Sequence, residues 1–383
     1  MKIIFISNYF NHHQQPFSDA MYKRLGDDYI FLAVAEVEQE RINMGWKASG
    51  FPFYVKQINY NNSDDLIKWS EIVADADVVI GSAFYYKLLT KRVSKNKLTF
   101  LYSERLYKSN LRFLKAPLHW YRAVRLSGCH MLCSSAFTPF DYSLTGNFIR
   151  KFYKWGYFPK VKEYDSVDSL MNMKAEEIGL KHQDVSILWV SRLIGLKHPE
   201  LPLKVARRLK DKGYQFKLSM IGVGPLEESI KRMIKDNGLE DNIKLQGKMS
   251  PEEVRVHMEK SEIFLFTSDR NEGWGAVLNE SMNSGCAVVA NKKIGSVPYL
   301  INDGINGFCY NTVEELTDKV ELLMGSHELR ERIGRNAYTT MISTWNADKA
   351  CENFFQLVNS LQKGCTTPIQ SGPCSKANII FGL

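Results

Sequence analysis

Two glutamates bracket a glycine-interrupted stretch, NEGWGAVLNES, at residues 271–281. Glu272 stands just before the glycines, which let a backbone approach a ligand closely. Glu280 follows in a segment whose pattern predicts a helix from about Ala276 to Ser284. Because its neighbours are apolar and a buried, unpaired carboxylate costs several kcal/mol, we expect Glu280 to have a hydroxyl or cationic partner. A surface position for Glu280 is the alternative interpretation.

Cations and glycines follow the neighbouring apolar runs. Arg192 and Lys197 come after the run 185–191, and Gly222 and Gly224 follow the next predicted strand. Ligands bind at the carboxyl ends of parallel strands, where helix N-termini offer N–H groups to phosphate. The two cations would neutralise a diphosphate as its bond breaks. Taken singly, each feature also fits a solvated loop or a plain strand–helix turn, since GVGP lacks the full GxGxxG signature.

Short apolar runs alternate with amphipathic helical segments along most of the chain. The runs are continuously apolar, as in strands covered on both faces, and the alternation predicts doubly wound parallel sheets. A length of 383 residues favours two domains. We expect an N-terminal Rossmann-like domain at 1–165, a linker at 166–182, a second Rossmann-like domain at 183–345, a helix at 346–363 that crosses back to the first domain, and a tail at 364–383.

The composition is typical of a soluble globular protein. A net charge of +8 fits an anionic ligand, an anionic membrane or nucleic acid, and selects none of them. Seven cysteines without a CxxC pair argue against a disulfide framework and against structural zinc. Without a long apolar run or a signal-like start, we expect a cytoplasmic protein.

Together these motifs resemble those of the family-4 retaining nucleotide-sugar glycosyltransferases of GT-B fold, the glycosyl transferases group 1. The resemblance rests on the E-x7-E pair Glu272 and Glu280, the R-x4-K pair Arg192 and Lys197, the GVGP turn, and the segment GSVPYLINDGINGF. They occur in the family's order across roughly 185–310. The resemblance implies two Rossmann-like, doubly wound parallel-sheet domains facing a central cleft, with an acceptor domain first.

The resemblance also implies residue roles. Glu272 would hydrogen-bond the donor sugar, Glu280 the ribose hydroxyls, and Arg192 and Lys197 the phosphates. The backbone amides that would hold the diphosphate, beside the glycines of the GVGP turn, belong to Gly273, Trp274, Gly275, Ala276 and Val277. The family uses no metal and no cofactor beyond its donor, and it transfers the sugar with retention.

We therefore expect a metal-independent hexosyltransferase that moves a sugar from a nucleoside diphosphate donor to a glycan or lipid-linked acceptor. Its place would be in the synthesis of cell-surface polysaccharide or glycolipid. The resemblance also implies that the leaving phosphate oxygen helps to remove the acceptor proton.

Two stretches of the first domain are candidates for contact with the acceptor or the phosphate. The loop NYFNHHQQP lacks the glycine pair frequent in the family, and its Asn11, His12 and His13 either touch substrate or form a hydrogen-bonded loop. Adjacent histidines do not easily share a metal ion, so we expect no metal site. Glu104 follows a later strand, where many family members carry a histidine, and it either orients the acceptor or pairs with Arg105.

The segment 104–125 is basic, with interleaved aromatic residues. Such a segment can lie on an anionic membrane surface, which would place the protein on the inner face of the cell membrane. A packed helix pair with a solvated face is the other interpretation.

Two rival functions stay open at the level of sequence. A nucleotide-sugar epimerase of the same fold would turn over donor without an acceptor. A nucleic-acid-binding protein is suggested by the net charge alone, and we expect no nucleic-acid partner.

Overall fold

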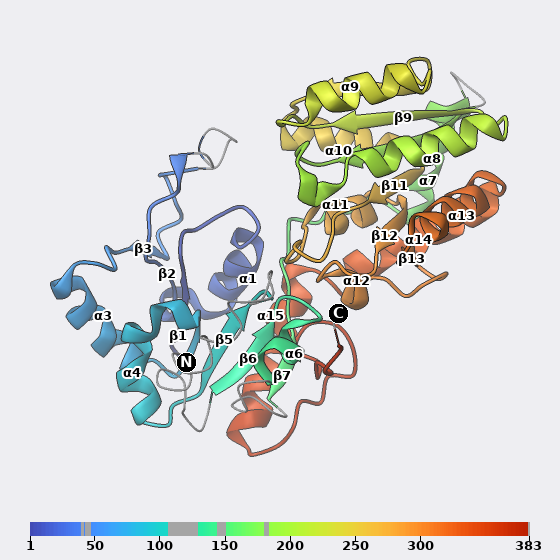
Figure 1. Cartoon of the computed structure of the whole chain (residues 1–383). Coiled ribbons are helices and arrows are strands. Elements are labelled where there is room, and N and C mark those ends of the chain that lie inside the picture. Colours follow the sequence, from blue (N-terminus) through green and yellow to red (C-terminus); the bar gives the residue numbers. More distant parts are fainter. Residues whose placement is uncertain (40–41, 43–46, 106–128, 144–150, 180–183, 382–383) are drawn as a thin grey trace. The chain divides into compact units, whose positions relative to one another are not determined.

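The chain divides into two compact units, each with its own sheet (Figure 1). The computed structural model describes residues 1–39, 42, 47–105, 129–143, 151–179 and 184–381. The first unit comprises Met1–Lys160 and Asn346–Leu383, and the second comprises Val161–Trp345. The two Rossmann-like α/β folds predicted from the strand–helix alternation are confirmed.

The first unit is built on a parallel sheet in the order β3-β2-β1-β4-β5-β6-β7 within the described residues. Strand β1 is buried at every position, as expected of a strand covered on both faces. The strands are β1 (Ile3–Ser7), β2 (Tyr29–Ala33), β3 (Val55–Gln57), β4 (Val78–Gly81), β5 (Thr99–Ser103), β6 (Cys129–Cys133) and β7 (Phe152–Lys154). The helices are α1 (Gln15–Leu25), η1 (Gly26–Asp28), α3 (Ser63–Asp75), η2 (Ala83–Tyr85), α4 (Tyr86–Ser94), α6 (Thr138–Ser143) and α15 (Ala347–Gln362).

The C-terminal segment belongs to the first unit. Helix α15 packs against α1, and the Phe354 ring lies 5.0 Å from that of Phe100, centroid to centroid. The residues after α15 do not form the expected tail, because Cys374 donates its N–H to the Lys154 carbonyl at 2.7 Å and Lys376 forms an antiparallel bridge with Tyr153. These backbone bonds to β7 hold a stretch that has no sequence periodicity of its own.

The second unit is built on a parallel sheet in the order β10-β9-β8-β11-β12-β13. Its strands are β8 (Val185–Val190), β9 (Phe216–Ile221), β10 (Ile243–Gly247), β11 (Ile263–Phe266), β12 (Ala287–Asn291) and β13 (Phe308–Tyr310). Its helices are α7 (Val167–Gly179), η4 (Gly195–Lys197), α8 (Glu200–Asp211), α9 (Glu227–Asp236), α10 (Pro251–Lys260), α11 (Val277–Asn283), α12 (Val297–Leu300), α13 (Val313–Met324) and α14 (His327–Ser343). The α10 helix begins with a capping box formed by Ser250 and Glu253.

Helix α7 occupies the segment expected to be a linker. Its Leu170 and Met171 are buried against Tyr338 of α14. Its Lys174 donates hydrogen bonds to the carbonyls of Met258 and Ser261, at 2.9 and 2.6 Å, at the end of α10. The surrounding polar residues conceal this short apolar pair in the sequence, and the pair and Lys174 together dock the helix.

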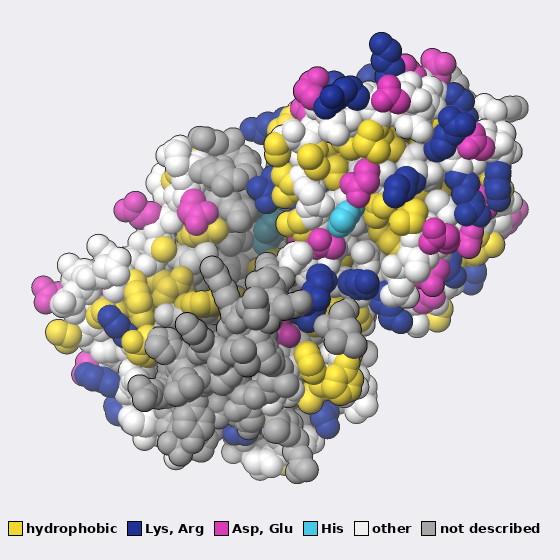
Figure 2. Space-filling view, viewed as in Figure 1, with side chains coloured by type: hydrophobic (Ala, Val, Ile, Leu, Met, Phe, Trp, Pro, Cys, Tyr) yellow, Lys and Arg dark blue, Asp and Glu magenta, His cyan; other side chains and the backbone are white. Residues whose placement is uncertain are grey.

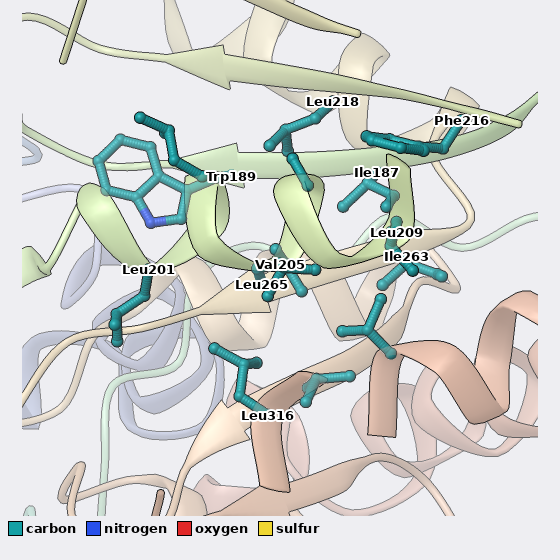
Figure 3. Close-up of a cluster of buried hydrophobic side chains, with 14 of the residues drawn as sticks. Ile187, Trp189, Leu201, Val205, Leu209, Phe216, Leu218, Ile263, Leu265 and Leu316 are labelled. Atoms are coloured by element: carbon teal, nitrogen blue, oxygen red, sulfur yellow. The ribbon is translucent and has the colours of Figure 1, made fainter. Parts of the chain in front are cut away.

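The core of the second unit fixes the strand ends that carry the candidate site (Figure 3). Leu201, Val205 and Leu209 of the amphipathic helix α8 pack over Ile187 and Trp189 of β8. Strand β8 lies between β9 and β11, so the loops that follow these three strands emerge side by side. The loops at this edge contain the predicted donor-site residues.

Charges of both signs are interspersed on the visible face of the second unit (Figure 2). Within the described residues of that face, Lys and Arg side chains alternate with Asp and Glu rather than forming one basic surface. This face therefore differs from the basic footprint typical of nucleic-acid-binding domains.

In the described part of the chain, no helix combines the length and apolar character needed to cross a bilayer.

Candidate functional site

An ion pair joins the loops that follow β8 and β11. Lys197 ends the short helix η4, and its ammonium pairs with the Glu272 carboxylate. Both side chains are only 14% exposed. The same loops are tied by the Asp269 N–H, which donates to the Leu196 carbonyl at 3.0 Å. The structure thus brings together two residues predicted to act in one site.

The glycines of GVGP allow the turn after β9 to pack against the loop after β8. Gly222 has φ of +135°, and a Cβ there would lie 1.9 Å from the Ser191 carbonyl oxygen. A Cβ on Gly224 would lie 2.5 Å from the Leu193 carbonyl oxygen. In this structure both glycines therefore act by close backbone packing, which shapes the edge beside Arg192.

The turn before α11 contains a row of backbone N–H groups, several of which have no hydrogen-bond acceptor among the described residues. Its first backbone hydrogen bond runs from the Leu278 N–H to the Gly275 carbonyl at 3.0 Å. Within the described residues, the preceding N–H groups without an acceptor are those of Gly273, Gly275, Ala276 and Val277. Gly275 has φ of +75°, and a Cβ there would lie 2.3 Å from the Phe266 ring, so this turn requires glycine. Clustered N–H groups of this kind suit an anion.

The Trp274 side chain anchors this turn from inside the unit. The indole is 1% exposed and donates to the Asn279 side-chain oxygen at 2.9 Å. Its ring lies 5.9 Å from that of Trp345, and its carbonyl accepts a hydrogen bond from the Ser296 hydroxyl. The predicted contribution of Trp274 to donor binding therefore concerns its backbone.

Glu280 lies in the first turn of α11 and is half-buried. Partial burial raises the pKa of its carboxyl group, and the nearby Arg255 charge opposes that shift. Arg255 donates to the Asn283 and Ser284 side chains at 2.9 and 3.1 Å and to the Glu280 carbonyl at 3.3 Å. No described group donates a hydrogen bond to the Glu280 carboxylate. Arg255 therefore places a positive charge near Glu280 without binding its carboxylate, which can still accept hydrogen bonds from hydroxyl groups.

Other charged residues at this edge were not singled out by the sequence patterns. His198 adopts a left-handed conformation with φ of 49°, and its ring contacts Glu200 at 2.8 Å and Asp269 at 3.4 Å. The buried Nε of Arg270 has no hydrogen-bond partner in the described part of the chain. By contrast, Arg192, which the sequence patterns did predict, is exposed and lies two residues after the end of β8. Positive φ at a non-glycine residue would have been a useful signal, but it is visible only in the structure.

In the first unit, the loop after β1 organises the start of α1. The Asn11 side chain accepts from the N–H groups of His13 and Gln14, at 3.0 and 3.2 Å. His12 is exposed, and the His13 ring stacks with Tyr157, their centroids 6.0 Å apart. These contacts match the hydrogen-bonded-loop interpretation, and substrate contact stays a prediction.

Glu104 accepts a hydrogen bond from the Tyr157 hydroxyl at 2.6 Å. Its neighbour Arg105 forms a buried ion pair with Asp141, Nε to Oδ2 at 3.5 Å. Each of the two residues predicted as a candidate pair therefore has a partner elsewhere. Apart from Glu104 and Arg105, the basic segment 104–125 lies outside the described residues.

The sequence of the second unit is similar to a known protein family. Residues 172–340 match the model of the family Glycosyl transferases group 1. The matched residues lie within the second unit and include Lys197, Glu272 and Glu280.

Two curated glycosyltransferases align with the chain over part of their length. Amylovoran biosynthesis glycosyltransferase AmsK of Erwinia amylovora is 34% identical over 148 residues, which are 36% of this chain and 36% of AmsK. Alpha-D-kanosaminyltransferase of Streptomyces kanamyceticus is 30% identical over 164 residues, 42% of each chain. The chain thus covers about two fifths or less of these relatives.

A solved structure extends the likeness to almost the whole chain. HepE of Anabaena, crystallised with UDP and glucose, superposes with a TM-score of 0.65 at 15% identity, covering 94% of this chain and 100% of HepE. This likeness concerns the fold, and it confirms the predicted GT-B class.

Replacing Gly222 by alanine should lower the free energy of unfolding by about 2 to 4 kcal/mol, because the new Cβ would collide with the Ser191 carbonyl. The control is Gly213→Ala, at φ of +77° with nothing within 4 Å of the new Cβ. It should lose only the positive-φ cost of about 1 kcal/mol. Urea unfolding of both variants separates collision from backbone strain, and equal losses would contradict the close-packing role.

Glu280→Gln should be more stable than the wild type at pH 8 and equally stable below about pH 4. The folded-state pKa of Glu280 lies above its unfolded value, so the folded chain holds the proton longer as pH rises. The wild type therefore loses stability as pH rises from the unfolded-state pKa of Glu280 through its folded-state pKa. Thermal unfolding of both proteins across this range measures the difference. A glutamine variant that is less stable at pH 8 would contradict a raised pKa.

Proposed function

We propose that this protein is a metal-independent, retaining glycosyltransferase that moves a hexose from a nucleoside diphosphate donor to a glycan or lipid-linked acceptor. The observation that carries the proposal is the Lys197–Glu272 ion pair beside the unpartnered N–H groups of the turn before α11. A cation, a carboxylate and a row of amides are the groups that a sugar attached to a diphosphate requires.

The diphosphate, the sugar and the ribose of a nucleotide sugar each have a chemical counterpart at this edge. The N–H groups from Gly273 to Val277 would bind phosphate oxygens, and Lys197 and Arg192 would neutralise the charge that grows as the bond to phosphate breaks. Glu272 would accept hydrogen bonds from the sugar hydroxyls, and Glu280 from the ribose. The ion pair compensates two largely buried charges, and a bound donor would give each charge a second partner.

The transfer itself needs no pair of catalytic carboxylates across the sugar. In the proposed reaction the acceptor hydroxyl attacks the anomeric carbon on the face that the phosphate leaves. The bond to the phosphate oxygen breaks, and that oxygen takes the acceptor proton. The configuration is retained because the attack and the departure occur on the same face. Lys197 and the amides would stabilise the negative charge on the leaving group until that proton arrives.

In the first unit, we assign the acceptor side to the residues around Glu104. The Glu104 carboxylate, which accepts a hydrogen bond from the Tyr157 hydroxyl, would orient an acceptor hydroxyl. The curated relative AmsK is named for the biosynthesis of amylovoran. We propose by analogy a role for this chain in cell-surface polysaccharide or glycolipid synthesis.

A panel of UDP, GDP, ADP and dTDP sugars should identify the donor by thermal stabilisation. At about 100 times its dissociation constant, the true donor should add about 2.7 kcal/mol to the free energy of unfolding. HepE was solved with UDP, so UDP sugars are the first to test. A panel without any stabilising nucleotide would contradict the proposal, and donor turnover without an acceptor would favour an epimerase.

Glu272→Ala should reduce sugar transfer by more than about a hundredfold while the protein stays folded, because both the sugar contact and the partner of Lys197 are lost. The matched control is Glu240→Ala, which removes an exposed glutamate of the same unit. Transfer of radiolabelled sugar and far-ultraviolet circular dichroism measure the two properties. Wild-type-like transfer by Glu272→Ala would refute the site assignment.

A further inference from the structure

A buried hydroxyl links the core of the second unit to the backbone of Lys197. Thr267 directly follows β11 and is 1% exposed. Its hydroxyl accepts a hydrogen bond from the Trp189 indole N–H at 2.8 Å and donates one to the Lys197 carbonyl at 2.7 Å. Trp189 is itself 1% exposed within the hydrophobic core (Figure 3). These two hydrogen bonds therefore connect the buried Trp189 side chain to the backbone of η4 through Thr267.

The loop after β11 consequently holds Lys197 at two places. Thr267 binds its carbonyl, and Glu272, five residues later, binds its ammonium. Between these contacts the Asp269 N–H donates to the Leu196 carbonyl. With the backbone and the charged end both fixed to one loop, few positions are left to the long lysine side chain. Such support is what a preorganised binding group needs.

We infer that Thr267 is a positioning residue for Lys197, and that its hydroxyl sets the place from which the ammonium meets Glu272 and a donor diphosphate. Thr267 need not touch the donor, since its hydroxyl is occupied on both sides by Trp189 and Lys197. The effect on nucleotide binding rests on the proposed function, whereas the effect on η4 does not.

Two substitutions separate the hydroxyl from the shape of the side chain. Thr267→Val keeps the branched shape but leaves the Trp189 N–H and the Lys197 carbonyl without their partner, whereas Thr267→Ser keeps the hydroxyl. The matched control is Thr317→Val, which removes another buried hydroxyl of the same unit. Thr317 is 5% exposed, and its hydroxyl accepts from Arg208 and donates to the carbonyl of Glu314, at 2.9 and 2.8 Å.

The first measurement is UDP affinity by isothermal titration calorimetry on the full chain, with GDP, ADP and dTDP as the other probes. Thr267→Val should weaken binding of the preferred nucleotide about tenfold, Thr267→Ser by less than about threefold, and Thr317→Val not at all. Wild-type affinity in Thr267→Val would overturn the inference while leaving the proposed function intact. A wild-type chain that binds none of the four nucleotides would instead refute the proposed function.

The second measurement needs no nucleotide. The amides of Lys197 and His198 donate to the carbonyls of Ile194 and Gly195, so their hydrogen exchange reports on the η4 turn. In Thr267→Val they should exchange at least about tenfold faster than in the wild type, and in Thr267→Ser and Thr317→Val at the wild-type rate. Unchanged exchange in Thr267→Val would show that the hydroxyl does not hold η4, and would overturn the inference even if that variant binds nucleotide weakly.

Discussion

The ion pair between Lys197 and Glu272 is the constraint around which the second unit's candidate site is built. Two opposite charges that are each only 14% exposed depend on one another, because either alone would be a poorly solvated charge. Their loops follow β8 and β11, which are neighbours in the sheet. The sheet brings the loops after β8 and β11 near each other, and the ion pair then links them directly.

The backbone around the ion pair supplies N–H groups, which the side chains of Lys197 and Glu272 do not provide as a row. Glycine at positions 222 and 224 lets the turn after β9 approach the loop after β8 at distances that exclude a Cβ. Gly275 does the same beside Phe266, and the buried Trp274 indole holds this turn from beneath. The turn consequently presents its N–H groups at the carboxyl edge of the sheet, where they are suited to an anion.

The first unit offers different chemistry at its strand ends. Glu104, Tyr157 and His13 combine a carboxylate, a phenol and an imidazole. A carboxylate held by a phenol suits the orientation of a hydroxyl group, whereas cations and amides suit phosphate. The contrast matches the proposed division between acceptor and donor, and it arises from side chains on two sheets of the same general design.

The sequence by itself determined the two parallel α/β units, the helix that carries Glu280, and the grouping of Lys197, Glu272 and the glycines at strand ends. Continuous apolar runs, capping residues and motif spacing are local signals, and they report burial and chain direction without tertiary information. Only the tertiary structure decided that Lys197 pairs with Glu272 across 75 positions, that Thr267 supports it, and that the Trp274 side chain faces inward. It also showed that helix α7 occupies the expected linker and that the expected tail is hydrogen-bonded to β7. These features depend on which distant surfaces meet, and the physical reason is that a pairwise contact leaves no periodic trace in either of the segments that form it.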